Sequence, residues 1–248
     1  MKPIENEESL DNGQPLVEHL IELRSRLLKI AGIVFVTFIP LLFFANDIYE
    51  LVSEPLRNLL PPGATMIATE VASPFLTPFK LAFVTSFFIT IPFILHQIWG
   101  FIAPGLYSSE KKFVGPIFLT SILLFYLGMA FAYFAVFPLV FDFFASVMPK
   151  GVSMMTDINR YLDFVLKLFF AFGLAFEIPI ATIILVWSGA ISLDSIKNKR
   201  PYVIVGCFVF GMLLTPPDVI SQALLAIPMW FLFEIGIFLC KAMRLGSD

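Results

Sequence analysis

The sequence predicts an all-α polytopic membrane protein with six transmembrane helices, and three observations carry this prediction. Of the 248 residues, 58% are hydrophobic and only 14% are charged, whereas a water-soluble domain of this size needs more charge to cover its surface. The hydrophobic residues fall in runs long enough to cross a bilayer as helices. Many of the 18 prolines and 14 glycines lie inside those runs, which predicts spans kinked by proline and glycine.

The N-terminal region divides into a polar lead and a first span. Residues 1–15 are acidic and lack apolar periodicity, so we expect them to be disordered. They also lack the apolar core of a cleavable signal peptide. Leucines then follow one helical stripe and Glu18, Glu22 and Arg26 another. The first span is predicted at about residues 27–45.

A second amphipathic segment follows the first span. Asn46-Asp47 resembles a helix cap, and apolar residues then alternate with charged ones at helical spacing. This pattern predicts a helix on the periplasmic membrane surface. We expect Pro55 to bend it and Pro61-Pro62-Gly63 to end it, with residues 64–76 outside the membrane.

The remaining apolar runs complete one transmembrane domain, predicted to cover residues 16–240, with a cytoplasmic tail at 241–248. Pro92 is expected to kink the second span. The fifth run is only about 20 Å long as a helix, so the last two spans are predicted to be short. These later spans are predicted at about residues 81–103, 113–144, 162–187, 202–214 and 219–240.

The distribution of lysine and arginine predicts the orientation. An even number of spans places both termini on one side, and positive charge favours the cytoplasm. Aromatic residues are expected to anchor the inner ends (Trp99, Tyr107, Trp187, Tyr202) and the outer ends (Tyr49, Tyr161). The opposite loops hold only Arg57, Lys150 and Arg160. The predicted cytoplasmic cations are Lys2, Arg24, Arg26, Lys29, Lys111, Lys112, Lys197, Lys199, Arg200, Lys241 and Arg244.

Enzyme motifs are absent from the sequence. With only His19 and His96 there is no HExxH pair, and no GxSxG elbow or phosphate-binding glycine loop occurs. Cys207 and Cys240 lie in apolar runs, where thiols behave as small hydrophobes. We therefore predict no enzymatic activity, no cofactor and no metal site.

Two acids lie at predicted inner entrances of spans. Glu22 precedes the first span and Glu110 the third. Two carboxylates so placed can accept two guanidinium groups, because the planar arginine fork matches a carboxylate. The alternative is that both are solvated charges with local partners, Glu22 with Arg26 and Glu110 with Lys111.

Glu177 lies about 15 Å inside the cytoplasmic end of its span. An ionised carboxylate there is costly, so it is expected to face a polar cavity, find a partner or bind a proton. Asp163 and Lys167, at i, i+4 spacing, are predicted to pair, and Lys80 is predicted to extend outward. These features leave open a proton-coupled small-molecule transporter that uses Glu177, or a structural scaffold. A transporter of that kind usually has a repeat pair, and none is visible.

Polar residues also flank the turn between the last two runs. Met212, Thr215 and Gln222 lie near a short helix end, where such groups hydrogen-bond to a neighbouring helix or cap the turn locally.

Several motifs, in order over about residues 15–240, resemble the TatC family, the six-span core subunit of the twin-arginine protein translocase. They are His19-Leu-Ile-Glu-Leu-Arg24, Phe101-Ile-Ala-Pro-Gly-Leu-Tyr107 with Glu110, Phe131-Ala-Tyr-Phe134 with Phe137-Pro138, Phe176-Glu-Ile-Pro179, and Lys199-Arg-Pro-Tyr202 with Leu214-Thr-Pro-Pro-Asp218.

The resemblance implies a receptor in the bacterial inner membrane, with both termini cytoplasmic. It implies binding of twin-arginine signal peptides and export of folded proteins with TatA and TatB, driven by the proton-motive force. It also implies self-association in a receptor complex, contact with the lipid bilayer and no nucleic-acid partner. The implied signal-peptide site comprises Glu22, Glu110, Phe101, His19 and Arg24.

The resemblance assigns further roles along the chain. Glu177 matches the intramembrane acid and Asp218 the acid after the Thr-Pro-Pro turn. Pro55 and Pro104 fall on characteristic structural positions. The region where TatA or TatB docks is matched by Met212, Thr215 and Gln222.

Overall fold

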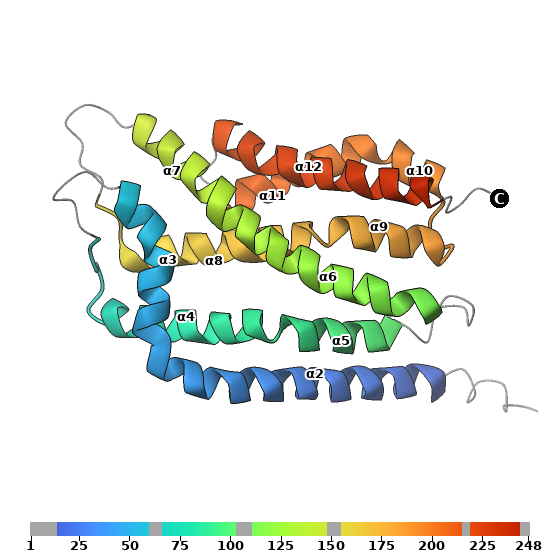
Figure 1. Ribbon diagram of the computed structural model, residues 1–248, viewed down its shortest axis with the longest axis horizontal. Helices are drawn as coiled ribbons and strands as arrows, with labels where there is room; N and C mark the ends of the chain where they lie inside the picture. Colours follow the sequence, from blue (N-terminus) through green and yellow to red (C-terminus); the bar gives the residue numbers. More distant parts are fainter. Residues whose placement is uncertain (1–13, 60–65, 103–110, 148–154, 215–218, 244–248) are drawn as a thin grey trace, which may run out of the picture.

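The computed structural model describes residues 14–59, 66–102, 111–147, 155–214 and 219–243, and they form an all-helical bundle. The long helices lie roughly side by side, and α3 crosses one end of the bundle (Figure 1). The helices are α2 (Gln14–Leu41), α3 (Ala45–Leu59), α4 (Ser73–Ile89), α5 (Ile91–Ile102), α6 (Lys111–Phe131), α7 (Phe137–Ser146), α8 (Ile158–Ala175), α9 (Ile178–Trp187), α10 (Leu193–Asn198), α11 (Arg200–Leu214) and α12 (Val219–Ala242).

The described helices account for the predicted spans. Four stretches are long and apolar enough to cross a membrane, and the bent pair α4–α5 makes a fifth. The shorter apolar helix α11 makes the predicted count of six consistent with this fold. With 15 residues, α11 is as short as predicted, but α12 has 24 residues and passes the length test. The prediction of a short last span was therefore wrong.

Prolines set where the spans bend. The α4–α5 pair bends by 49° at Thr90, next to the predicted kink at Pro92, which has no N–H for the carbonyl of Phe88. Between α6 and α7 the helix widens into the π-helical turn η3 (Ala132–Val136), just before Pro138. Pro179 lies in the first turn of α9, after the break from α8. The predicted kink at Pro92 is confirmed, and prolines also accompany the π-helical turn before α7 and the break before α9.

The predicted cap at Asn46 is wrong, because the chain stays helical there. The 3₁₀ turn η1 (Leu42–Phe44) joins α2 to α3, and its flanking residues Leu41 and Ala45 both have right-handed helical backbone angles. Pro40, in the last turn of α2, removes one hydrogen bond just before this turn. Pro55 lies within α3, which ends at Leu59, before the Pro-Pro-Gly stretch.

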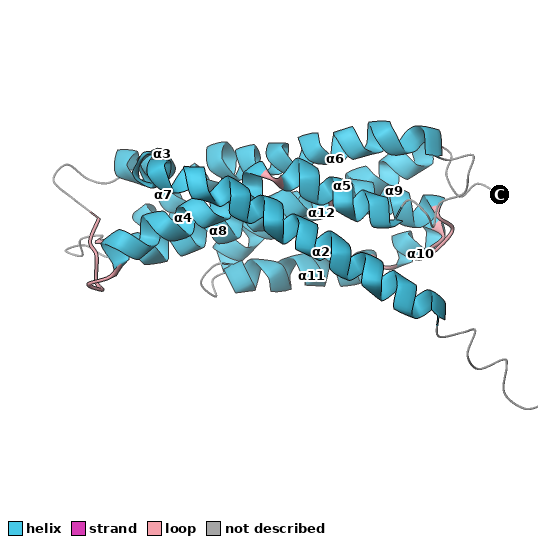
Figure 2. Ribbon diagram, turned by 90° about the horizontal axis from the view of Figure 1, so that it is seen from below, coloured by secondary structure: helices cyan, strands magenta, loops and turns pink. Residues whose placement is uncertain are grey.

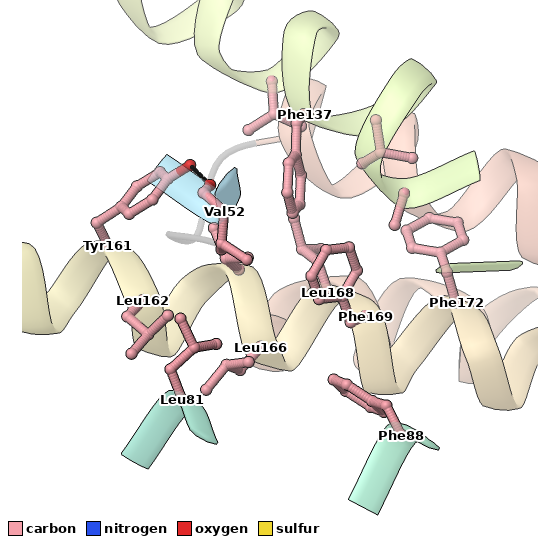
Figure 3. Packing of buried hydrophobic residues seen from close by; sticks show 14 of the residues in the cluster. Val52, Leu81, Phe88, Phe137, Tyr161, Leu162, Leu166, Leu168, Phe169 and Phe172 are labelled. Carbon is pink, nitrogen blue, oxygen red and sulfur yellow. Dashed lines mark hydrogen bonds between the residues drawn. The ribbon is translucent and has the colours of Figure 1, made fainter. Parts of the chain in front are cut away.

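The largest core cluster lies where α3, α4, α7 and α8 meet, and Figure 3 shows part of it. Val52 of α3 packs into this cluster, and the Tyr161 hydroxyl donates to the Val52 carbonyl at 2.9 Å. Tyr161 and Trp99 are only 2% and 5% exposed. These two residues therefore pack inside the protein, contrary to the predicted aromatic anchoring, whereas Tyr202 is exposed.

Close backbone contact joins α6 and α8. A Cβ added to Gly128 would lie 2.4 Å from the Phe172 carbonyl oxygen, so only glycine fits at this crossing. Small residues allow such approach between membrane helices, where the hydrophobic effect gives no drive for packing.

Asp157 joins two distant segments of the chain, and the sequence analysis did not identify it. Its Oδ1 caps α8 by accepting from the backbone N–H groups of Asn159 and Arg160, each at 3.0 Å. Its Oδ2 accepts from the Thr69 hydroxyl at 2.6 Å and the Thr69 N–H at 2.9 Å. A parallel β-bridge between Ile67 and Asp157 lies beside them. Asp157 thus joins the segment before α4 to the start of α8.

Removing this carboxylate is expected to destabilise the protein. Hydrogen bonds, first from the Thr69 hydroxyl and then from backbone N–H groups, lower the pKa of Asp157 to about 2 from its ordinary 3.8. The unfolded chain therefore takes up this proton at higher pH than the folded chain, and stability falls as pH drops from about 4 to about 2. Asp157→Ala should cost about 1.5–3 kcal/mol at pH 7 and remove this pH dependence. Thermal unfolding in detergent between pH 2 and 7 measures both effects. Asp142→Ala, an exposed acid on α7, is the control, and an equal loss in both variants would contradict the prediction.

One predicted ion pair is formed with a different partner. Asp163 pairs with Lys80 of α4 rather than with Lys167 on its own helix. The prediction of an i, i+4 pair is wrong because α4 packs against α8 and brings Lys80 closer. Lys80 therefore has an acidic partner, and Lys167 is left exposed.

Candidate binding site and buried carboxylate

Glu22 forms an ion pair with Arg26 one helical turn later on α2. The guanidinium donates to Oε1 of Glu22 from Nη2 at 2.6 Å and from Nε at 2.9 Å. This is the local pair that the sequence analysis kept as an alternative. The Glu22 side chain remains 40% exposed and that of Arg26 21% exposed.

Arg26 also reaches the end of α5. Its Nη1 donates to the backbone carbonyl of Gln97 at 3.2 Å and to the side-chain Oε1 of Gln97 at 3.3 Å. Its Nη2 donates to the Gly100 carbonyl at 2.9 Å. The last carbonyls of a helix have no partner within it and carry partial negative charge, so a cation fits well there. Arg26 thereby holds Glu22 beside the C-terminal end of α5.

The position of Arg26 depends on Gly100. A Cβ added to Gly100 would lie 2.6 Å from Nη1 of Arg26. The absence of a side chain at this residue leaves the space in which the guanidinium lies. Figure 2 shows α2 crossing the near face of the bundle at a slant.

The two oxygens of Glu22 differ in availability. Arg26 takes Oε1 with two N–H groups, and no hydrogen bond from a described residue reaches Oε2. A guanidinium from a ligand can therefore bind Oε2 directly, but it can use both oxygens only if Arg26 moves. The sequence predicted that a ligand guanidinium binds both carboxylate oxygens of Glu22. Arg26 already occupies one of them, Oε1.

The other predicted members of this site are placed only in part. Phe101 is half-buried next to Gly100, and Arg24 is exposed on α2. His19 lies in α2, but its side chain lies outside the described residues, as does that of Pro55. Glu110 and Pro104 also lie outside them. The meeting of Glu22 with Glu110 therefore stays a prediction.

Glu177 lies at the break between α8 and α9, as half of a polar pair inside the bundle. Its Oε2 accepts from the Ser121 hydroxyl of α6 at 2.5 Å. Its Oε1 is buried, and no described residue donates to it. Of the environments expected for this acid, the structure places a partner, Ser121, on a neighbouring helix.

Phe176, the residue before Glu177, belongs to an aromatic cluster. The Phe131 ring lies 5.6 Å from that of Phe176 and 5.5 Å from that of Phe172. A carboxylate held there by one hydroxyl has an oxygen left for a further donor, such as water.

The predicted docking residues lie around the α11–α12 pair, which packs side by side. Met212 is 49% exposed on α11 and Gln222 is half-buried on α12. Thr215 and Asp218 lie outside the described residues.

The sequence analysis missed three residues of these sites, Gln97, Gly100 and Ser121. Gln97 carried a usable signal, since an amide inside an apolar run needs a hydrogen-bond partner. Gly100 and Ser121 carried none, because their roles depend on which helix packs against them.

Comparison with known proteins identifies the family. Residues 18–228 match the family described as Sec-independent protein translocase protein (TatC). The chain is 64% identical to the Sec-independent protein translocase protein TatC of Azotobacter chroococcum, over 94% of this chain and 92% of the relative. It is 58% identical to that of Escherichia coli K12, over 94% and 90%.

A crystal structure of the twin-arginine translocase receptor TatC has the same fold. The TM-score is 0.82 at 38% sequence identity, over 91% of this chain and 99% of the other. The chain therefore belongs to the TatC family, the receptor and core subunit of the twin-arginine translocase, a multi-span membrane protein of Sec-independent protein translocation and not an enzyme.

Proposed function

We propose that this chain binds signal peptides through two consecutive arginines, one at Glu22 and one at Glu110. The arrangement that carries the proposal is the set of hydrogen bonds of Arg26, which holds the partly exposed Glu22 at the end of α5, the helix that carries Phe101. Glu110 lies just before α6, so the chain leaving α5 leads to it. An exposed carboxylate next to an aromatic ring suits a guanidinium, which binds both.

The site lies on the cytoplasmic side of the bacterial inner membrane in this proposal. The start of α2, the end of α5, the start of α11 and the end of α12 lie at one end of the bundle (Figure 1). The described cations toward that end are Arg24, Arg26, Lys197, Lys199, Arg200 and Lys241, with Lys29 halfway along α2, whereas Arg57, Lys80, Arg160 and Lys167 lie toward the other. Cytoplasmic segments of membrane proteins carry an excess of positive charge, and this rule supports a cytoplasmic location for both termini.

Folded precursor proteins are then exported with TatA and TatB, driven by the proton-motive force. Met212, Thr215 and Gln222 are the proposed docking residues for these subunits, and the chain self-associates in a receptor complex. Exposed Met212 supports this role, because flexible methionine side chains adapt to apolar partners. The alternative of a small-molecule transporter is not retained, because the family acts in protein translocation.

A photocrosslinking experiment tests the signal-peptide site. A photoreactive residue replaces Ile98, which is 44% exposed on α5, so that Phe101 and Gly100 stay intact. A labelled Arg-Arg signal peptide should crosslink about tenfold more than a Lys-Lys peptide, because lysine offers a point charge without the fork. The same probe at Phe43, 85% exposed at the other end of α2, is the control and should capture neither peptide. Equal yields from both peptides at residue 98 would refute the proposal.

A further inference from the structure

A groove of about 490 Å³ opens on the bundle surface between α4, α8 and α11. Its volume lies in the range of pockets that hold small organic ligands. The α8 wall consists of residues at helical spacing, beginning with Asp163 and Lys167 and ending with Leu174. Lys80 comes from α4, and Phe210 from α11. Nothing in the proposed function uses this groove.

The polar and apolar groups of the groove lie at opposite ends. Lys80, Asp163 and Lys167 lie toward the end where α4 and α8 begin. Phe170 and Leu174 follow on α8, toward the middle of the bundle. A ligand that fits both ends has one charged end and one apolar end.

The polar end carries one unbalanced positive charge. Lys80 and Asp163 form an ion pair with each other. Lys167 is exposed, and within the described part of the chain it forms no ion pair or hydrogen bond. The partner that this end lacks is therefore an anion.

The depth of Lys167 matches a lipid headgroup. From Lys167 to Trp187 at the other end of the α8–α9 span, the helix rises by about 30 Å, the thickness of the hydrocarbon core. With Trp187 at one edge of the hydrocarbon core, Lys167 lies at the other, where its long side chain extends toward the lipid phosphates.

We propose that this groove binds one anionic phospholipid. Its phosphate pairs with Lys167, and an acyl chain lies between Phe170 and Leu174 of α8 and Phe210 of α11. The groove walls favour a lipid chain over a partner helix. Helices pack in membranes through small residues, but Ala171 is the only small residue among the described groove residues. A flexible chain fills a bulky, irregular wall more readily than a rigid helix.

Native mass spectrometry of the purified full-length chain in detergent tests this site. The probes are phosphatidylglycerol, phosphatidylcholine and diacylglycerol with identical acyl chains. Phosphatidylglycerol should bind at least tenfold more tightly than diacylglycerol, with phosphatidylcholine between them. Lys167→Gln should lower phosphatidylglycerol binding about tenfold and leave diacylglycerol unchanged. Lys29→Gln, an exposed lysine on α2, is the control and should change neither.

A second variant tests the apolar part. Ala171→Trp fills the groove and should reduce binding of all three lipids, while Lys29→Gln retains them. Equal binding of the three lipids to the unchanged protein would overturn the proposal, as would equal effects of Lys167→Gln and Lys29→Gln. If Ala171→Trp instead blocks co-purification of TatA or TatB and leaves lipid binding intact, the groove is a helix-docking surface and the proposal is wrong.

Discussion

Replacing Glu22 by glutamine is expected to weaken binding of an Arg-Arg signal peptide by about 10- to 100-fold, as removal of a charge-assisted hydrogen bond of about 1.5–3 kcal/mol predicts. The amide keeps the size and one acceptor oxygen but loses the charge that attracts the guanidinium. It also leaves Arg26 without its anion. Fluorescence anisotropy with a labelled peptide and the purified protein measures the change in Kd.

Two variants and a second peptide make this result specific to the site. Glu50→Gln changes an exposed acid on α3 and should leave the Kd within a factor of two. Arg26→Lys keeps the positive charge but loses the fork that reaches both Glu22 and Gly100, so an intermediate loss is expected. If Glu22→Gln weakens the Arg-Arg and Lys-Lys peptides by the same factor, the acid does not recognise arginine.

The second large effect is expected at Glu177. Glu177→Gln should reduce transport of a folded precursor more than tenfold while changing signal-peptide affinity less than twofold. The reason is position: Glu177 is a half-buried acid at the α8–α9 break, hydrogen-bonded to Ser121, whereas Glu22 lies in the N-terminal part of α2. Transport of the precursor into inverted membrane vesicles and the Kd of the signal peptide, measured on the same preparations, give the two changes.

Ser121→Ala is the matched control for this carboxylate. It removes the hydrogen bond to Oε2 but keeps the acid itself, so transport should fall by less than in Glu177→Gln. Equal losses of transport and peptide binding in Glu177→Gln would show that the acid supports the fold and has no separate part in transport.

The sequence predicted the helical class and most spans because hydropathy and proline act locally. Most spans consist of about 20 or more apolar residues, and Pro92, Pro138 and Pro179 each remove an N–H wherever the helix packs. The bounds predicted for the last span, about 219–240, lie close to those of α12, Val219–Ala242, and only its description as short was wrong. Its Pro228 does not end the helix.

Partner choice could not be predicted in the same way. Asp163 has Lys167 at ideal spacing on its own helix but pairs with Lys80, and Arg26 adds Gln97 and Gly100 to its expected partner Glu22. These contacts depend on how α4 and α5 lie against α8 and α2. A single sequence read by periodicity holds no record of that arrangement.

The hydrogen bonds of Arg26 that join α2 to α5 affect how Glu22 can exchange partners. α5 is a short helix. The 49° bend at Thr90 joins it to α4, and Arg26 donates a hydrogen bond to it near its C-terminal end. A ligand guanidinium that took both oxygens of Glu22 would displace Arg26 from that carboxylate, while the hydrogen bonds of Arg26 to Gln97 and Gly100 would still join α2 to the end of α5. The carboxylate can therefore exchange partners without releasing α5, which also packs against α6.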